Sequence, residues 1–188
     1  YPGLIVHGIY TGKLNNGGEQ ITLTHALGGR ILSFDYKNSG RWPITPDGWG
    51  FSLVPRHPNA NPDHGSPSNW RASANHGGSP DTDDPSATLP PVLVNEALTH
   101  TDLPDVDAIE LFNPSSAEVD LSGWFLTDDP AQPRKFRIPD VTMIAAGGYR
   151  VFSETNFNPN PLSDTNSFAL SASGDQVYLF SGDAGGNL

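Results

Sequence analysis

The side chains best suited to bind a ligand are three aspartates in one short segment, Asp102, Asp105 and Asp107. Carboxylates spaced this closely can supply oxygen ligands to Ca²⁺, a hard cation that takes roughly six to eight of them. The spacing is not that of an EF-hand loop, because no glycine and distal glutamate follow in the required order. Two interpretations therefore stand side by side: a calcium site, or a solvated acidic loop between two strands.

A second acidic cluster is formed by Asp81, Asp83 and Asp84. It lies in a proline-rich segment of the kind that links domains. Bound Ca²⁺ would attach this linker to a neighbouring domain. The alternative is a solvated linker that binds no metal.

Three histidines, His57, His64 and His76, share one irregular stretch with Asp63. If the stretch folded back on itself, these four side chains would suit Zn²⁺ or Ni²⁺. Their spacing matches no standard zinc pattern, and histidines on surface loops are the simpler interpretation.

Catalytic motifs are lacking from the sequence. It contains no cysteine, and therefore no thiol nucleophile, thiolate metal site or disulfide. No serine-nucleophile elbow, zinc-protease helix or phosphate-binding glycine loop occurs. A glycosidase needs two facing carboxylates, and nothing singles out a pair among the 21 acidic residues. We therefore expect no enzyme and no cofactor, with calcium at Asp102, Asp105 and Asp107 as the leading candidate ion.

The composition narrows the range of partners. The chain has 188 residues with 21 acidic and 10 basic side chains, a formal net charge of −11. Phosphate backbones and anionic membranes repel such a chain, and no apolar run is long enough to cross a bilayer. Abundant aspartate with only three lysines favours an extracellular or surface module of a bacterium. A protein or a surface polysaccharide is the expected partner.

Strands are expected throughout. The 20 glycines and 18 prolines leave little uninterrupted sequence for a helix, and short alternating runs between turn residues are typical of a β-sandwich. Expected strands lie near residues 4–9, 19–24, 30–36, 50–54, 92–98, 109–112, 119–121, 124–126, 136–138, 149–151, 168–170 and 177–179. Residues 55–84 are expected to be irregular.

An internal repeat relates residues 14–23 to residues 170–179 at an offset of 156. Leucine, glycine, glutamine and leucine are identical at corresponding positions, and Ile21 and Glu19 correspond to Val177 and Asp175. Each copy reads as a glycine turn followed by an alternating strand. We interpret the two segments as one structural unit that occurs twice.

The second half of the chain resembles a bacterial lamin tail domain. The resemblance rests on residues 92–97, 107–114, 119–129, 136–139, 146–149 and 170–175, in the family's order. Residues 12–80 resemble the closing part of the same domain type. The resemblance to the lamin tail domain implies an immunoglobulin-like, all-β sandwich without catalysis of its own. The resulting domain prediction is a C-terminal half of an upstream unit over 1–80, a linker over 81–91, and a sandwich lacking its last strand over 91–188.

The function expected from this resemblance is protein contact, adhesion or spacing within a larger secreted or surface protein. The alternative is a carbohydrate-binding accessory module, in which Trp42, Trp49 and Trp70 would stack on sugar rings. The strand at 30–36 matches the strand that the 91–188 sandwich is expected to lack. It would fill that edge within one chain, or between chains as a strand-swapped homodimer.

Overall fold

The computed structural model describes residues 3–6, 8–86, 88–99, 101–102, 104–161, 166–183, 185 and 187–188. The chain divides into two compact units, unit 1 over Tyr1–Ala87 and unit 2 over Thr88–Leu188. The boundary falls within the segment predicted to be a linker. Nearly all regular structure in the described residues is β, and the one α-helix among them, α1, is Glu154–Phe157. No helix of this part of the chain is long and apolar enough to cross a membrane.

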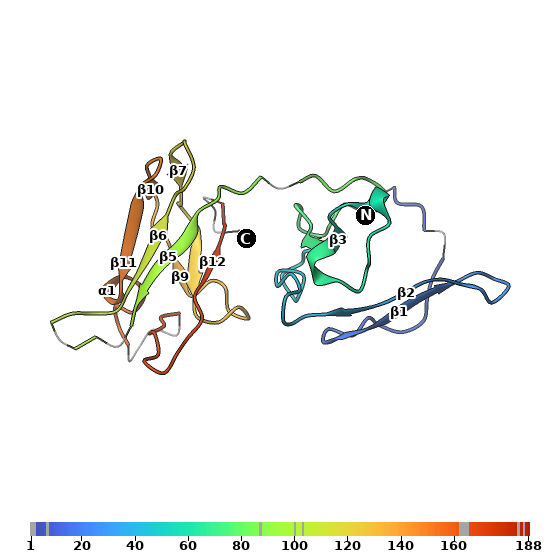
Figure 1. Ribbon diagram of the computed structural model, residues 1–188, viewed down its shortest axis with the longest axis horizontal. Helices are drawn as coiled ribbons and strands as arrows, with labels where there is room; N and C mark the ends of the chain where they lie inside the picture. The colour runs from blue at the N-terminus through green and yellow to red at the C-terminus, as the bar shows by residue number, and fades with distance from the viewer. Residues whose placement is uncertain are drawn as a thin grey trace. The chain divides into compact units, whose positions relative to one another are not determined.

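Unit 2 is a β-sandwich, as the sequence predicts. Its strands are β5 (Leu93–Leu98), β6 (Ala108–Phe112), β7 (Val119–Asp120), β8 (Phe125–Thr127), β9 (Phe136–Arg137), β10 (Met143–Ile144), β11 (Tyr149–Ser153) and β12 (Tyr178–Phe180). One sheet has the order β11-β6-β5, a second has the order β12-β8-β9, and β10 pairs with β7. All of these pairs are antiparallel. Figure 1 shows β5, β6 and β11 side by side.

Alternation along β6 shows how the sequence builds this core. Ile109 and Leu111 are fully buried. Ala108, Glu110 and Phe112, which alternate with them along the strand, belong to the opposite face of the sheet. The buried residues of both sheets form one cluster, which includes Leu126 and Ile138 of the facing layer. Burial of each such aliphatic side chain contributes about 1.5–3 kcal/mol, so this cluster is the main source of the unit's stability.

Gly123 marks a close approach between two backbone segments. Its φ is +79°, and a Cβ at this position would lie 2.1 Å from the carbonyl oxygen of Asp183. The glycine therefore lets the turn before β8 contact the segment after β12. Trp124, the next residue, is only 7% exposed.

Asn113 is a fully buried polar residue at the end of β6. Its amide nitrogen donates hydrogen bonds to the carbonyl oxygens of Ala117, Ile144 and Ala145 at 2.8, 3.1 and 3.1 Å. Its amide oxygen accepts from the backbone N–H and the hydroxyl of Ser115 at 3.0 and 2.7 Å. The side chain thus ties the end of β6 to β10 and to the turn that follows β10.

The main-chain groups of Asn113 join the same junction. Its N–H donates to the carbonyl oxygen of Gly148, and the N–H of Gly147 donates to its own carbonyl oxygen, both at 3.0 Å. Every hydrogen-bonding group of this buried residue therefore has a partner, which is the condition for a buried polar group to be stabilising.

Two strand predictions are wrong. The described residues of 4–9 form no strand, and Ile5 and Ile9 are 72% and 93% exposed. An alternating segment without a neighbouring strand has no partner for its backbone. Residues 168–170 are not a strand either, although Phe168 and Leu170 are buried. Phe168 stacks on Phe157 of α1 at a ring distance of 4.7 Å, so alternation here predicts burial but not pairing.

Unit 1 contains a long hairpin and a small irregular part. The hairpin pairs β1 (Gly18–Thr24) with β2 (Arg30–Lys37), and β3 (Leu53–Pro55) pairs with β4 (Trp70–Ala72). Two short 3-10 helices, η1 (Pro58–Ala60) and η2 (Pro67–Asn69), lie between β3 and β4. The 55–84 segment is thus mostly irregular, as predicted, but contributes one strand.

Aromatic rings hold unit 1 together. Trp70 lies 5.5 Å from the ring of Phe34, 5.6 Å from His64 and 6.1 Å from Trp42, between ring centres. Trp42 and Trp70 are only 7% and 8% exposed. These rings join the hairpin to the irregular part.

We predict that replacing Asn113 with alanine lowers the free energy of unfolding of unit 2 by about 3 kcal/mol, because it leaves buried carbonyl groups without donors. Urea titration of the full chain, followed through the NMR signal of the Trp124 indole, measures the effect. The matched control is Asn160→Ala at an exposed asparagine of the same unit. Equal midpoints for the two variants would contradict the assigned role of Asn113.

Val141 occupies a strained backbone conformation. Its φ is +63°, a region that β-branched residues rarely adopt, and its side chain is 87% exposed. The turn is held by Ser122, whose hydroxyl accepts a hydrogen bond from the N–H of Val141 at 2.8 Å. The same hydroxyl donates to the carboxylate of Asp120. Hydrogen bonds from Ser122 lower the pKa of Asp120 below its ordinary value.

Because Val141 gives strain without burial, we predict that Val141→Gly raises the free energy of unfolding of unit 2 by about 1 kcal/mol. The urea midpoint of the Trp124 signal measures this gain. Val151→Gly is the control, because it removes an equally branched side chain from a strand and should destabilise. A lower midpoint for Val141→Gly would show that the positive φ stores no strain.

Candidate functional site

The outward surface of the β11-β6-β5 sheet exposes apolar side chains. The register aligns Leu93 of β5, Phe112 of β6 and Tyr149 of β11 in one row. The rings of Phe112 and Tyr149 stack at 4.7 Å. Leu93, Leu98, Tyr149 and Val151 are 46–58% exposed. We call this surface, made of Leu93, Asn95, Glu96, Leu98, Glu110, Phe112, Tyr149 and Val151, the outer face.

Two carboxylates lie in the middle of the outer face. Glu96 of β5 is directly opposite Glu110 of β6, at an irregularity in the pairing between Val94 and Glu96. Asn95 donates a hydrogen bond of 2.7 Å from its amide nitrogen to Glu110. Like charges opposite each other on neighbouring strands destabilise a sheet. A basic group placed between them would remove this repulsion.

The calcium candidates lie near the end of the same sheet but differ in environment. Asp102 and Asp105 are exposed, whereas Asp107 is 8% exposed and accepts a hydrogen bond of 3.0 Å from Thr101. Among the described residues, no three histidine, aspartate or glutamate side chains lie together as a metal site requires. The geometry gives the calcium site at Asp102, Asp105 and Asp107 no support, and it stays a prediction.

The histidine cluster is likewise not assembled by the fold. His64 packs against Phe34 and Trp70, and the Trp70 indole N–H donates to its carbonyl oxygen at 2.9 Å. His76 lies edge-on to Phe51 at 5.9 Å between ring centres. The two imidazoles therefore belong to separate aromatic contacts.

The tryptophans proposed to stack on sugars are largely packed inside unit 1. Trp42 and Trp70 are buried and expose little ring surface to solvent, and Trp49 is half-buried. A cavity of about 460 Å³ does lie beside the hairpin, with Phe34, Tyr36, Phe51 and Trp70 among its lining residues. Unit 1 thus offers an aromatic cavity rather than an open platform.

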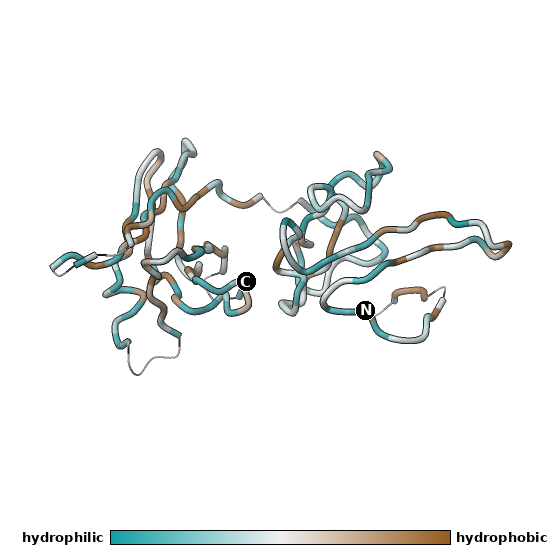
Figure 2. Tube along the Cα trace, turned by 60° about the horizontal axis from the view of Figure 1, so that its bottom comes forward, coloured by the Kyte–Doolittle hydropathy of each residue, from teal (hydrophilic) through white to brown (hydrophobic). Residues whose placement is uncertain are grey.

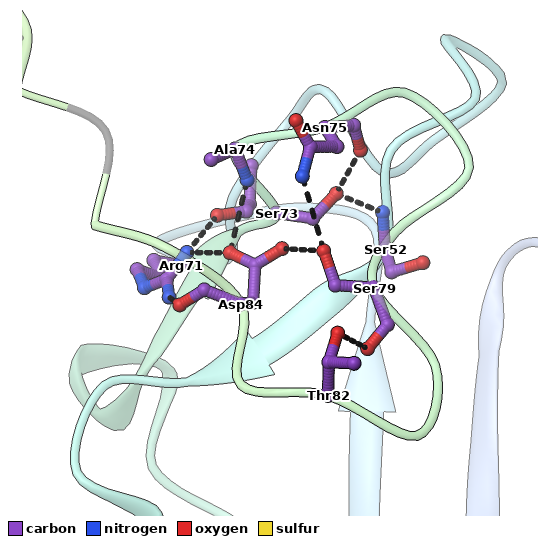
Figure 3. Close-up of polar contacts among 9 residues, drawn as sticks. Ser52, Arg71, Ser73, Ala74, Asn75, Ser79, Thr82 and Asp84 are labelled. Atoms are coloured by element: carbon purple, nitrogen blue, oxygen red, sulfur yellow. Dashed lines mark hydrogen bonds and ion pairs between the residues drawn. The ribbon is translucent and has the colours of Figure 1, made fainter.

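A polar network closes the C-terminal part of unit 1 (Figure 3). Asp84 forms an ion pair with Arg71 of β4, and its side chain is only 4% exposed. The Asp84 carboxylate also accepts hydrogen bonds of 3.0 Å from the N–H of Ala74 and from the hydroxyl of Ser79. Arg71 in turn donates to the backbone carbonyl of Asp84 at 2.8 Å. Residue 84, in the predicted linker, is therefore anchored to unit 1.

This network shifts the titration of Asp84. Burial of the carboxylate acts to raise its pKa, but the hydrogen bonds from Arg71, Ala74 and Ser79 and the positive charge of Arg71 together outweigh burial and lower the pKa. Because these donors occupy its carboxylate, Asp84 anchors the chain, whereas Asp81 and Asp83 of the same acidic cluster are exposed.

A family model, the Lamin Tail Domain, matches residues 85–188. These residues are unit 2 with the three residues before it, and they are more than half of the chain. The chain belongs to the lamin tail domain family. No curated protein and no solved structure gives a significant match.

The family assignment agrees with the fold of unit 2. The sandwich with its antiparallel sheets is what an immunoglobulin-like lamin tail domain requires. The matched residues begin at Pro85, so the resemblance of residues 12–80 to a second lamin tail domain stays a prediction.

The Asp84 network predicts a pH dependence of unit 1. A carboxylate whose pKa is lowered by folding contributes stability above its unfolded pKa, near the ordinary value of 3.8, and loses that contribution as the pH falls through the lower folded pKa. We predict that Asp84→Asn lowers the urea midpoint of unit 1 at pH 7 and weakens its decline below about pH 4. Tryptophan fluorescence measures the midpoint, because three of the four tryptophans are in unit 1.

Asp83→Asn is the matched control, because Asp83 is an exposed neighbour with the same side chain. It should leave both the midpoint and its pH profile unchanged. If the two variants behaved alike, the ion pair with Arg71 would not be the anchor of this segment.

Proposed function

We propose that the chain is a non-catalytic protein-contact module and that the outer face of unit 2 is its contact surface. The observation that supports this proposal is a sheet face with four side chains about half exposed, although they are large and apolar. Exposed apolar groups gathered on one surface mark interaction sites more often than chance positions do. The face lies on β5, β6 and β11, which form one three-stranded sheet (Figure 1).

The chemistry of the outer face indicates the kind of protein that fits it. Apolar side chains flank the opposed pair Glu96 and Glu110 along β5 and β6 and on the neighbouring strand β11. A complementary partner presents a lysine or arginine between apolar side chains, because the cation would relieve the repulsion of the two carboxylates as water is excluded. The partner surface we propose is therefore basic at its centre and apolar around it.

We further propose that the module acts within a larger secreted or surface protein of a bacterium. Support comes from the composition, which has abundant aspartate, few lysines and a net charge of −11. Such a charge keeps a module soluble and disfavours nucleic acid as a partner. In this setting the module would hold a neighbouring domain at a surface.

The contact surface can be tested with a random peptide library displayed on phage, selected against the full chain. We predict that the selected peptides carry a lysine or arginine flanked by apolar residues. Val151→Asp and the double variant Glu96→Gln/Glu110→Gln should each weaken their binding at least tenfold, as measured by biolayer interferometry.

The control for the charge change is Glu118→Gln, at an exposed glutamate outside the outer face. It should bind the selected peptides as the wild type does. Peptides without this pattern, or peptides whose binding survives both outer-face variants, would exclude the outer face as the contact surface.

Carbohydrate binding is the runner-up, and the aromatic cavity of unit 1 is the place for it. Pull-down with insoluble cellulose, chitin and peptidoglycan separates the two functions. We predict no retention on any of the three. Retention that is lost in Tyr36→Ala or Phe51→Ala would favour the carbohydrate-binding module instead.

A further inference from the structure

The turns that precede β1 and β12 have the same hydrogen bonds. In unit 1 the N–H of Gly18 donates to the carbonyl oxygen of Asn15 at 3.1 Å, and the N–H of Asn15 donates to the Glu19 carboxylate at 3.0 Å. In unit 2 the corresponding bonds run from Gly174 to Ser171 and from Ser171 to Asp175, both at 3.1 Å.

The glycine conformations also agree. The φ angle is +106° at Gly18 and +112° at Gly174, a region that excludes most other residues. The segments share sequence, glycine conformation and both turn hydrogen bonds at a constant offset of 156 residues. The strand after each turn, β1 in one case and β12 in the other, is therefore the same type of strand.

The neighbours of the two strands differ. β1 pairs with β2 over its whole length, with Ile21 opposite Phe34 and Leu23 opposite Leu32. β12 pairs with β8 along one edge, and no strand of the described residues pairs with its other edge. The outer edge of β2 is likewise unpaired in this part of the chain. Free strand edges carry unpaired N–H and C=O groups that favour the addition of another strand.

Charges at the ends of the two edges are complementary. β2 begins at Arg30 and ends at Lys37, whereas β12 is preceded by Asp175 and followed by Asp183. Antiparallel pairing of β2 with β12 would bring Arg30 near Asp183 and Lys37 near Asp175. The two spans, 30–37 and 175–183, differ by a single residue in length.

The distribution of charge over the chain also favours contact between unit 1 of one copy and unit 2 of the other over contact between two copies of unit 2. Unit 2 holds 14 of the 21 acidic side chains and four of the 10 basic ones, whereas unit 1 holds seven acidic and six basic ones. Unit 2 therefore has a formal net charge of about −10 and unit 1 of about −1, so two copies of unit 2 repel each other strongly, whereas unit 1 of one copy meets much weaker repulsion from unit 2 of the other.

The hairpin also presents apolar side chains that its own unit does not cover. Leu23, Leu27 and Ile31 are 55%, 90% and 61% exposed. Figure 2 shows hydrophobic segments along the hairpin and at its tip. A second copy that pairs with β2 would cover part of this surface.

From these observations we infer that two copies of the chain associate by strand addition: β2 of one copy pairs antiparallel with the free edge of β12 of the other. The result is one sheet with the order β1-β2-β12-β8-β9, in which the first two strands come from one copy. When each copy receives the other's hairpin, both edges are satisfied and the assembly closes as a dimer. This contact goes beyond the proposed function and uses different strands from the outer face.

The first experiment measures the mass of the full chain by light scattering after gel filtration, over a range of concentrations. We expect a dimer of twice the chain mass of 20.1 kDa. The double variant Arg30→Glu/Lys37→Glu should raise the dimer dissociation constant at least tenfold, and added salt should raise that of the wild type. A wild-type chain that stays at 20.1 kDa overturns the inference.

The matched control is Lys13→Glu/Arg41→Glu, which makes the same charge change at exposed residues of unit 1 outside the hairpin. This variant should dimerise as the wild type does. Equal weakening by both double variants would mean that net charge, and not the ends of β2, controls association, and would overturn the proposed pairing.

The second experiment locates the contact and distinguishes it from pairing within one chain. The chain lacks cysteine, so Ile31→Cys carries a single nitroxide label. Mixed with unlabelled, ¹⁵N-enriched wild type, the labelled chain should broaden the amide signals of residues 178–180. Broadening elsewhere, or broadening of these signals only when the label and ¹⁵N are in the same molecule, contradicts association between copies through β12.

Discussion

The side chain of Asn113 is the contact on which the architecture of unit 2 depends. It is completely buried and satisfies three carbonyl groups and one serine that are close in space but belong to different elements. A buried amide is costly unless all its groups are paired, and the arrangement that pairs them is unique. The asparagine therefore fixes where β6 ends and where β10 lies, while the apolar cluster supplies most of the stability.

This junction bears directly on the contact surface that we propose, because β6 is the central strand of the β11-β6-β5 sheet. When the end of β6 is fixed, so are the register that stacks Phe112 on Tyr149 and the register that opposes Glu96 to Glu110. The interior thus determines the chemistry that the outer face presents. The edge of β12 that no described strand pairs with belongs to the other sheet, so the two contacts that we propose use separate surfaces.

The sequence predicts the strands that have a clear alternation of buried and exposed residues, and β6 is an example. It overpredicts residues 4–9, where alternation is present but no neighbouring strand pairs with it. A strand as short as β10, with two residues, gives no periodic signal.

The contacts that the sequence does not predict have a common physical origin. The partners of the Asn113 side chain lie up to 32 residues away, and the Asp84 carboxylate meets Arg71 across 13 residues. Such contacts depend on the tertiary fold, and no local pattern encodes them. The sequence does show Asn113 as the end of a strand and the 81–91 segment as acidic and proline-rich. From those features alone, Asn113 would be taken only as the end of a strand, and the 81–91 segment only as a free linker.

Hydrogen exchange of the wild-type chain tests the central role of the Asn113 junction most directly. The amide hydrogens of Asn113 and Gly147 are both bonded within this junction, although neither belongs to a strand. If the buried asparagine closes the sandwich, both should exchange as slowly as the amides of Ile109 and Leu111 in the core, through global unfolding alone. Exchange at the rate of exposed loop amides would show that the junction opens independently of the core and would contradict the account.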